Sequence, residues 1–249
     1  MTPPEVSVVV PAYNEGQAIV PCVERILQAS AAEVEVLVVY DRPDDTTAAP
    51  VADLAARDPR IRPVLNKVRQ GPAGALRAGF EAAQADVVVV TMADGSDDVS
   101  QIDKLVELVR RGFVVAAASR YMRGGRQLGG PPLKGLVSRT AGISLQLLAR
   151  VGTHDATNSF KAYSRHFVEE VGIESDAGFE MGIELVAKAR RRGRPVAEIP
   201  TTWRDRTAGQ SNFKVREWIP RYLHWYLVAA VPGYERWRPH RGKSAWKES

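Results

Sequence analysis

The segment Asp86-Val-Val-Val-Val-Thr-Met-Ala-Asp94 constrains the fold more than any other part of the sequence. Residues 87–91 are five consecutive β-branched residues, a run that is too short for a helix and apolar on both faces. Such a run predicts a strand buried inside a parallel sheet. It is followed by the polar run Asp94-Gly-Ser-Asp-Asp98. Because open α/β sheets bind ligands at the carboxyl ends of their strands, these residues are candidates for a binding site.

The polar run after this strand allows two interpretations. Its oxygen ligands suit a hard divalent cation such as Mg²⁺ or Mn²⁺, which proteins often hold with one or two carboxylates and substrate phosphates. Alternatively, Asp97, Asp98 and Ser100 cap the helix expected over residues 99–111. Asp94 is the stronger ligand candidate, because it leaves the strand before any helix begins.

Strands and helices are predicted to alternate four times before residue 112. Further strands are expected at 6–10, 34–40 and 61–65, with helical segments between them. This alternation is typical of βαβ units and a mostly parallel sheet, so the predicted fold class is α/β. The rest of the chain is expected to contain a strand at 113–118, a short extended segment near 154–161, an extended segment at 196–203, and helices at 133–150, 179–192 and 214–231. We expect one domain over residues 1–231 and a polar tail over 232–249.

The amino-acid composition indicates in which cellular compartment to expect the protein. The net charge of +5 permits attraction to phosphates, nucleic acid or anionic lipid, without choosing among them. The single cysteine, Cys22, excludes an internal disulfide and favours a reducing compartment. No secretory leader is visible, and no apolar run approaches the roughly 18 residues that cross a bilayer. We therefore expect a cytoplasmic protein that is soluble or peripheral at the cytoplasmic face of a membrane.

Several loops add cations to the acidic strand ends. The second strand ends in Asp41, the loop 66–74 is basic and contains glycine, and arginines occur in the loops 119–126 and 204–211. At one edge of a sheet, these groups suit a metal–diphosphate ligand, because cations and a metal together stabilise a departing phosphate. The turn after the first strand lacks the G-x-G-x-x-G pattern, which argues against a nicotinamide-dependent enzyme.

Five motifs in order extend this interpretation. They are Val8-Val-Val-Pro-Ala-Tyr-Asn-Glu15, the acidic ends of the second and fourth strands, Ser119-Arg-Tyr-Met-Arg-Gly-Gly125, Asn158-Ser-Phe-Lys-Ala-Tyr163 and Arg206-Thr-Ala-Gly-Gln-Ser211. With them, residues 5 to 230 resemble the family 2 glycosyltransferases of the GT-A (Rossmann-like) fold. Within that family the resemblance is to the dolichol-phosphate mannosyltransferase, or polyprenyl-phosphate glycosyltransferase, branch.

The resemblance implies a role for each matching residue. Pro11, Tyr13, Glu15, Asp41 and Asp94 would bind the nucleotide sugar, with Asp41 at the base and Asp94 as the surviving metal ligand of the family's Asp-x-Asp motif. Arg120 would contact the donor or acceptor phosphate. Lys134, Ser138 and Arg206 would hold the phosphate of a lipid acceptor. The implied catalytic set is therefore Asp94, Arg120 and Arg206.

The sequence departs from the family pattern at the metal. Met92 replaces the first Asp of Asp-x-Asp, and Ser96 stands where relatives have a metal-ligating Gln. A thioether is a poor ligand for hard cations. The expected Mg²⁺ or Mn²⁺ set is therefore Asp94 and Ser96, with Asp97 recruited. One acid is also missing at the end of the second strand, where Tyr40 precedes Asp41.

The activity that the resemblance implies is transfer of a hexose, with inversion, from a nucleoside-diphosphate sugar to a polyprenyl or dolichyl phosphate. GDP-mannose is the favoured donor, a membrane surface is an expected partner, nucleic acid is not, and no oligomeric state is predicted. A phosphate acceptor is already nucleophilic at neutral pH, whereas an alcohol would need a general base such as Asp155 or Glu180. The alternatives are a soluble glycosyltransferase with a non-lipid acceptor and a catalytically silent nucleotide-sugar binder, which Met92 favours.

The last expected helix, over residues 214–231, carries an aromatic stripe that allows two interpretations. Trp218, Tyr222, Trp225 and Tyr226 lie beside Arg216 and Arg221, a pattern that suits an amphipathic helix at a membrane interface. The same helical spacing is typical of a stripe that packs against a protein core.

Overall fold

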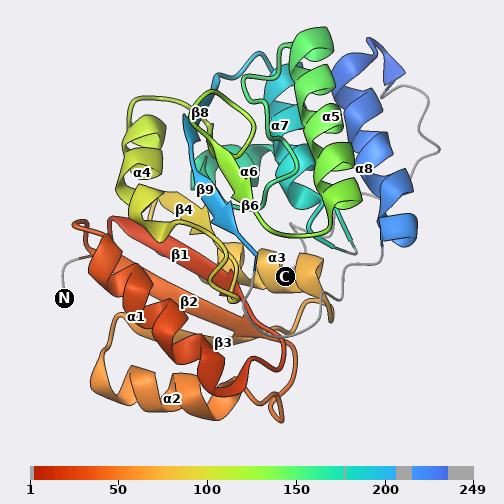
Figure 1. Cartoon of the computed structure of the whole chain (residues 1–249). Coiled ribbons are helices and arrows are strands. Elements are labelled where there is room, and N and C mark those ends of the chain that lie inside the picture. The colour runs from red at the N-terminus through yellow and green to blue at the C-terminus, as the bar shows by residue number, and fades with distance from the viewer. Residues whose placement is uncertain (1–2, 177, 206–214, 235–249) are drawn as a thin grey trace.

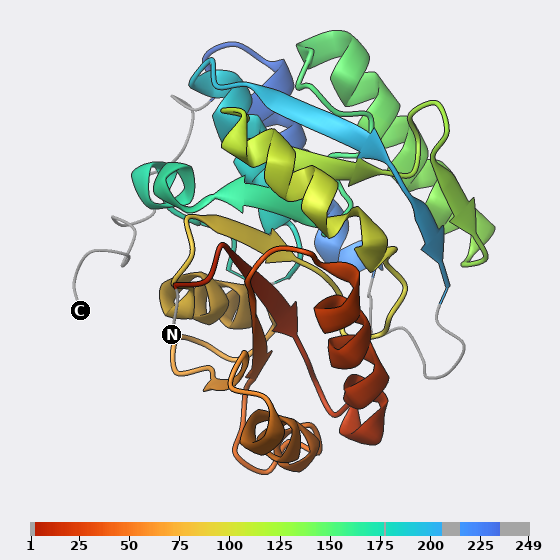
Figure 2. The same ribbon diagram turned by 90° about the vertical axis from the view of Figure 1, so that its left-hand side faces the viewer.

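The computed structural model describes residues 3–176, 178–205 and 215–234. Within these residues, a seven-stranded sheet has helices on both faces (Figures 1 and 2). Its strand order is β3-β2-β1-β4-β7-β5-β8. All strands run parallel except β7, which is antiparallel to both of its neighbours, β4 and β5. The α/β class and the mostly parallel sheet predicted from the sequence are confirmed.

The strands of this sheet are β1 (Val6–Pro11), β2 (Val34–Tyr40), β3 (Ile61–Leu65), β4 (Val87–Val90), β5 (Val115–Ser119), β7 (Lys161–Ser164) and β8 (Val196–Pro200). A separate pair, β6 (Arg126–Leu128) and β9 (Thr202–Arg204), forms a small parallel sheet. The helices are α1 (Ile19–Ala29), α2 (Ala48–Arg57), α3 (Pro72–Ala82), α4 (Ile102–Arg110), α5 (Pro132–Ala149), α6 (Arg165–Val171), α7 (Met181–Arg191) and α8 (Val215–Ala230). Short 3₁₀ turns, η1 (Gly16–Ala18) and η2 (Val99–Gln101), precede α1 and α4.

The valine runs bury both faces of the sheet, as the sequence predicts. Successive side chains of a strand point to opposite faces. Val8 accordingly packs in a cluster with residues of α1, α2 and α4, while Val9 packs in a second cluster with residues of α3 and α5–α8. Both valines have no exposed surface. The two clusters hold the strand ends rigidly in place, which gives the loops at those ends a fixed frame.

Two segments differ from the sequence prediction. The extended segment expected near residues 154–161 is not a strand. The strand β7 begins only at Lys161, which is fully buried, and β7 is a central strand of the sheet. Its composition hides this position, because a central strand is normally a continuous apolar run. Residues 196–203 form two strands in two different sheets, since β8 pairs with β5 and β9 pairs with β6.

The aromatic residues of α8 face the protein where the structure describes them. Trp225 is buried, and Tyr222 and Tyr226 pack against the core cluster of α3 and α5–α8. For these three residues the structure favours the core-stripe interpretation over the interfacial one. The side chains of Arg216 and Trp218 lie outside the described residues. None of the helices that the structure describes is long and apolar enough to cross a membrane.

Close packing of α3 on β1 leads to the first prediction. A Cβ on Gly79 would lie 2.3 Å from Cγ1 of Val9. In an exposed helix Gly→Ala stabilises by about 1 kcal/mol, whereas overpacking a core costs about 1–3 kcal/mol. We expect Gly79→Ala to lower the free energy of unfolding in urea. Adding Val9→Ala should make the effect of Gly79→Ala less unfavourable, and strict additivity of the two changes would contradict the contact.

Candidate functional site

The carboxyl ends of β1, β2, β4 and β5 lie at one edge of the sheet, because these strands run in the same direction. Pro11 ends β1, Asp41 follows β2, Asp94 follows β4 by four residues, and Arg120 follows β5. Residues that are up to 109 positions apart in the sequence are thereby brought to the same edge. This is the edge at which α/β sheets bind ligands.

The loop after β1 is tied to the loop after β2. The N–H of Asn14 donates to both carboxylate oxygens of Asp45 at 3.1 Å, and the N–H of Glu15 donates to Oγ1 of Thr47 at 3.1 Å. Asn14 takes a left-handed conformation with φ of 54°, which bends the chain here. Tyr13, predicted to line the nucleotide pocket, is 61% exposed on this bend. Its ring is therefore accessible to a base or sugar.

Asp41 organises the loop after β3. Its Oδ1 accepts a hydrogen bond from Nδ2 of Asn66 at 2.7 Å, and its Oδ2 accepts one from the N–H of Gly71 at 2.6 Å. Asn66 is buried and also bonds the backbone of Arg69 and Val68, so one side chain holds the whole turn. Sequence reasoning missed Asn66. A carboxylate oxygen accepts more than one hydrogen bond, so contact with a base remains a prediction for Asp41.

In the loop after β4, the acidic residues have different environments. Oδ1 of Asp94, which is partly exposed, accepts from the N–H of Ser96 at 3.0 Å. Asp97 is buried, and its Oδ2 accepts from Oγ1 of Thr91 at 3.0 Å and the N–H of Met92 at 3.1 Å. Burial raises the pKa of Asp97 to about 6. These contacts favour a role for Asp97 in holding the loop rather than the predicted role as a metal ligand.

Asp98 and Ser96 also make contacts that hold the loop. Oδ1 of Asp98 accepts from the N–H of Ser100 at 3.3 Å at the start of η2, so the capping interpretation is confirmed for Asp98. Ser96 is buried, and its carbonyl accepts from the N–H of Arg204 at 3.0 Å. This bond places the end of β9 against the loop that carries Asp94.

The side chains of this loop limit how a metal ion could bind. In the parts of the chain that the structure describes, no group of three or more His, Cys, Asp and Glu residues forms a metal site. Asp94 is partly exposed, Asp98 caps η2, and the side chain of Met92 supplies no oxygen ligand. The residues present therefore fit a Mg²⁺ or Mn²⁺ ion that is shared between Asp94 and a substrate diphosphate, which is a common way to hold Mg²⁺.

Arg120 is held by a buried carboxylate. Its Nε and Nη2 donate to the two oxygens of Asp155 at 2.7 and 2.9 Å, and its backbone N–H donates to the same side chain at 3.0 Å. Burial alone would raise the pKa of Asp155, but the Arg120 guanidinium holds it below its usual value. Asp155 is fully buried and ionised in this pair. These contacts favour a role for Asp155 in holding Arg120 over the suggested role of general base.

Arg120 also contacts a predicted acceptor-phosphate residue. Its Nη2 donates to Oγ of Ser138 at 3.3 Å, and that hydroxyl lies 2.7 Å from Oγ1 of Thr157. The guanidinium stacks over the ring of Tyr121 at 4.8 Å. The structure thus brings Arg120, predicted to contact the donor or the acceptor phosphate, together with Ser138, predicted to contact the acceptor phosphate. A fixed cation beside hydroxyl groups is suited to an anionic oxygen.

The other two acceptor residues are only partly described. Lys134 lies in the first turn of α5, one turn before Ser138, but the position of its side chain is not described. Arg206 lies outside the described residues. Asp205 precedes it, and the N–H of Asp205 donates to the carbonyl of Leu128 at 2.9 Å. The chain therefore approaches residue 206 from the small sheet beside the Asp94 loop.

Lys161, which the sequence reasoning did not assign, fixes the segment that carries Asp155. Its Nζ donates to the carbonyl of Ala156 at 3.1 Å and to the carbonyl of Asn158. Asn158 in turn donates from Nδ2 to the carbonyl of Ala118 at 2.8 Å. Burial lowers the pKa of Lys161 to about 7. Lys161 lies within the motif Asn158–Tyr163, but the motif by itself gives this lysine no role.

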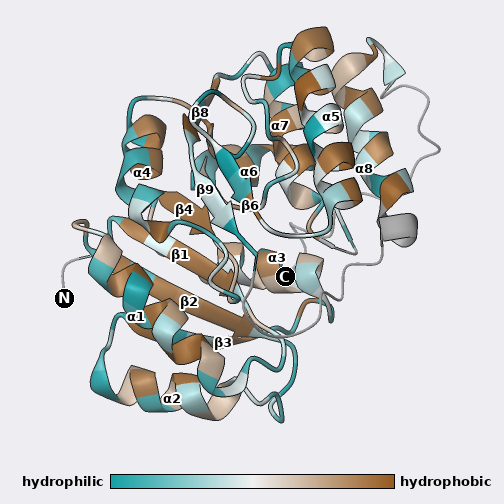
Figure 3. Ribbon diagram, viewed as in Figure 1, coloured by the Kyte–Doolittle hydropathy of each residue, from teal (hydrophilic) through white to brown (hydrophobic). Residues whose placement is uncertain are grey.

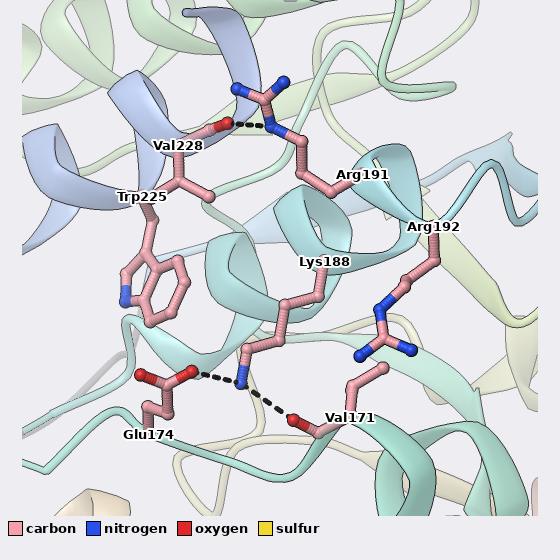
Figure 4. Close-up of a pocket in the computed structure, with 7 residues that line it drawn as sticks. All are labelled: Val171, Glu174, Lys188, Arg191, Arg192, Trp225 and Val228. Atoms are coloured by element: carbon pink, nitrogen blue, oxygen red, sulfur yellow. Dashed lines mark hydrogen bonds and ion pairs between the residues drawn. The ribbon is translucent and has the colours of Figure 1, made fainter. Parts of the chain in front are cut away.

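A cavity of about 270 Å³ lies elsewhere in the molecule (Figure 4). It is lined by Val171, Glu174, Lys188, Arg191, Arg192, Trp225 and Val228. The end of α7 leads into the first residue of β8, so this cavity is at the edge of the sheet opposite the strand ends. Nζ of Lys188 donates to Glu184 at 2.6 Å and the carbonyl of Gly172 at 2.8 Å. These bonds tie α7 to the turn after α6, and Nε of Arg191 donates to the carbonyl of Val228 on α8. The cavity is not part of the candidate site.

The environment of Lys161 gives the second prediction. Its folded pKa, about 7, lies below the unfolded value of roughly 10.4. Between these values the unfolded chain binds a proton that the folded chain does not, so this lysine makes stability rise with pH. Lys161→Met should lower the free energy of unfolding by about 1–3 kcal/mol, because two buried carbonyls lose their donor. In urea titrations from pH 7 to 10, the advantage of the wild type over the variant should grow; a constant difference would contradict the lowered pKa.

The chain is similar to known proteins over most of its length. The family described as "Glycosyl transferase family 2" matches residues 7–172, which is more than half of the chain. The polyprenol monophosphomannose synthase of Mycolicibacterium smegmatis is 32% identical over 227 residues, covering 85% of both chains. The glycosyltransferase AglD of Haloferax volcanii is 37% identical over 209 residues, which are 80% of this chain but only 33% of that protein. The dolichol-phosphate mannosyltransferase of Pyrococcus furiosus is 29% identical, with 92% of this chain and 65% of that protein covered.

Solved structures agree on the fold. The glucosyl-3-phosphoglycerate synthase of Mycobacterium tuberculosis superimposes with a TM-score of 0.65 at 19% identity, covering 96% of this chain and 82% of that one. The mostly parallel sheet and the helices on its faces are thus those of GT-A proteins. The family match and the relatives confirm the resemblance to the dolichol-phosphate mannosyltransferase branch. The chain belongs to glycosyltransferase family 2 and is an enzyme of that family.

Proposed function

We propose that this enzyme transfers a hexose, with inversion, from a nucleoside-diphosphate sugar to a polyprenyl or dolichyl phosphate. The observation that carries the proposal is the cradle formed by Arg120 and Ser138 at the carboxyl edge of the sheet. The cradle shares that edge with Asp94 and Asp41, the residues assigned to the donor. Relatives named for polyprenol- and dolichol-phosphate mannose transfer support the acceptor.

The state of Asp155 favours a phosphate acceptor. A phosphate monoester has its second pKa near 6, so it is ionised and nucleophilic at neutral pH without a general base. An alcohol acceptor would need a base. Asp155, which lies nearest the cradle among the two carboxylates considered for that role, is committed to Arg120 as a buried ion pair. The site is therefore better suited to an acceptor that is already deprotonated at neutral pH.

The transfer requires one bond to form and one to break. An oxygen of the acceptor phosphate attacks the anomeric carbon, while the bond from that carbon to the diphosphate breaks and a nucleoside diphosphate leaves. Arg120 and Ser138 orient the attacking phosphate, and Tyr13, Glu15 and Asp41 bind the nucleoside. Mg²⁺ or Mn²⁺ bound at Asp94 with the diphosphate would supply Lewis-acid stabilisation of the leaving group. The M. tuberculosis synthase, whose structures contain UDP with Mn²⁺ or Mg²⁺, supports this use of a metal in the fold.

The donor is proposed to be GDP-mannose, because several relatives are named for mannose transfer. A second candidate function is transfer to a soluble phosphorylated acceptor. It is favoured by the likeness to glucosyl-3-phosphoglycerate synthase, since Arg120 and Ser138 would recognise any phosphate group. Radiolabelled GDP- and UDP-sugars incubated with polyprenyl phosphate or 3-phosphoglycerate distinguish the two functions. Transfer to neither acceptor would leave the silent-binder alternative.

The third prediction concerns Asp94. Turnover should require Mg²⁺ or Mn²⁺ and should fall at least about a hundredfold in Asp94→Ala, because electrostatic stabilisation of the leaving group is a major part of the rate. Asp98→Ala is the matched control on the same loop, and it should change mainly stability. Initial rates with and without EDTA check both expectations. Undiminished turnover in EDTA, or full activity of Asp94→Ala, would contradict the assignment.

The fourth prediction concerns Arg206. Arg206→Ala should raise the KM for polyprenyl phosphate with little effect on donor binding, because its role is to grip the acceptor phosphate. Arg206→Lys should restore activity only in part, since the charge returns without the bidentate guanidinium. Initial rates with saturating donor and titrated acceptor measure this. A variant that loses donor affinity while keeping its acceptor KM would move Arg206 to the diphosphate.

A further inference from the structure

The carboxylate of Asp41 is held at both of its oxygens. Strand β2 is hydrophobic along most of its length (Figure 3), and Asp41 is the first residue beyond it. Nδ2 of Asn66 donates to Oδ1 at 2.7 Å, and the N–H of Gly71 donates to Oδ2 at 2.6 Å. Bonds to both oxygens fix the plane of the carboxylate as well as its position. A carboxylate has about four lone-pair sites, and Asp41 is partly exposed, so both oxygens can still accept from a ligand.

Asn66 is a rigid support for this carboxylate. It is buried, and its backbone N–H donates to the carbonyl of Tyr40 at 2.8 Å. Its Oδ1 accepts from the N–H of Val68 at 2.9 Å. Its Nδ2 donates to the carbonyl of Arg69 at 2.6 Å as well as to Asp41. These bonds fix the orientation of the amide, because exchange of its oxygen and nitrogen would place an acceptor against two acceptors.

The turn that carries both donors packs directly on α3. A Cβ on Gly74 would lie 1.7 Å from the carbonyl oxygen of Arg69, so the turn touches the backbone of the helix. Gly71 has a left-handed φ of 104°, which side chains other than that of glycine disfavour. The amide of Asn66 and the N–H of Gly71 therefore cannot move away from Asp41 without disturbing this packing. The two donors form a frame that exists before any ligand binds.

We propose that Asn66 is a positioning residue for the donor nucleotide, which holds the carboxylate of Asp41 against the hydrogen-bonding edge of the base. The proposal rests on the donor half of the proposed function and is independent of the acceptor. An ionised carboxylate only accepts hydrogen bonds. Guanine and uracil each have a protonated ring nitrogen that donates to it, whereas the corresponding ring nitrogen of adenine and cytosine is an acceptor. The held carboxylate therefore favours guanine or uracil over adenine or cytosine.

The orientation of Asp41 matters because it decides how strongly a wrong base is rejected. A fixed carboxylate that faces the ring nitrogen of adenine loses its water and gains no hydrogen bond, which is a large penalty for a charged group. A carboxylate that can turn rotates toward solvent and avoids this penalty. Without Asn66, Oδ1 of Asp41 loses its partner and the carboxylate can turn about its Cβ–Cγ bond. Discrimination between bases therefore depends on Asn66, which acts through Asp41.

Calorimetric titration of the full chain with GDP, UDP and ADP in the presence of Mg²⁺ tests the proposal without sugar transfer. The wild type should bind GDP or UDP at least about tenfold more tightly than ADP. Asn66→Ala should weaken binding of the preferred nucleotide about tenfold, because a hydrogen bond to a charged group is lost. Its affinity for ADP should change by less than about twofold. Equal losses for all three nucleotides would show only a collapsed loop and would overturn the proposal.

A second variant separates the two roles of the Asn66 side chain. Asn66→Asp keeps the size of the side chain and the oxygen that accepts from the N–H of Val68, so the turn should persist. It replaces the donor to Asp41 with a second acceptor. Its loss of affinity should again be confined to the preferred nucleotide. Affinities equal to those of the wild type would contradict the role of the Nδ2 donor.

A double-mutant cycle and a stability control complete the test. Asp41→Ala should weaken the preferred nucleotide at least about tenfold, and adding Asn66→Ala should change that affinity by less than about twofold, because the carboxylate that Asn66 holds is gone. Additive losses would overturn the proposal. The control is Ser7→Ala, since the buried Oγ of Ser7 donates to Glu35 at 2.5 Å and accepts from the N–H of Ala85 at 3.0 Å. It should lower Tm, as Asn66→Ala should, and leave all three affinities unchanged.

The outcomes distinguish this proposal from the proposed function. A wild type that binds none of the three nucleotides would overturn both. A wild type that binds ADP as tightly as GDP and UDP, or an Asn66→Ala variant that keeps the preference of the wild type, would reject only the positioning role of Asn66. A loss in Asn66→Ala that is confined to GDP or UDP, in a chain that transfers no sugar to prenyl phosphate or 3-phosphoglycerate, would reject only the proposed function.

Discussion

The buried ion pair between Arg120 and Asp155 is the interaction on which the candidate site depends. Removing two charges from water is costly, and only good geometry and additional hydrogen bonds offset that cost. Here the guanidinium makes two side-chain bonds and the backbone of Arg120 makes a third. Loss of either partner would leave a charge buried without compensation. The pair therefore fixes the end of β5 relative to the segment that follows α5.

Lys161 on β7 also holds the segment that carries Asp155. An antiparallel strand in the centre of a parallel sheet enters from the carboxyl edge, so its first residue lies beneath the site. Lys161 is that residue, and its amine binds the carbonyls of Ala156 and Asn158. A neutral amine still has two N–H donors for two acceptors. Because β7 runs antiparallel, its first residue lies at the carboxyl edge of the sheet. Lys161 can therefore hold the segment that carries Asp155, the partner of Arg120.

Most of the polar residues at this edge hold loops in place. Asp41, Asp45 and Asp97 each accept hydrogen bonds from backbone N–H or nearby side chains, which shape the turns around the pocket. Tyr13 and Asp94 remain at least partly exposed on those turns. The arrangement separates residues that build the frame from residues that can meet a ligand.

The sequence determined the sheet and the edge at which the site lies. The runs at Val6, Val34 and Val87 are strands because β-branched residues without polar breaks suit a doubly covered sheet. Where such parallel strands end, Asp41, Asp94 and Arg120 must meet, so the sequence order alone assembled the candidate residues. The motifs around them were local enough to indicate the family.

Only the tertiary structure decided which of these residues build the frame and which face a ligand. Asp94 and Asp97 are three positions apart and chemically alike, yet one is partly exposed and the other is buried under the strand end. The spacing of the aromatic residues in α8 fits both a helix that packs on a core and a helix at a membrane interface. They are buried because α8 packs against α5 and α7. Burial depends on contacts between segments far apart in the chain. The spacing of residues within one helix does not reveal those contacts, because the same apolar spacing occurs in a helix at a membrane and in a helix that packs on a protein core.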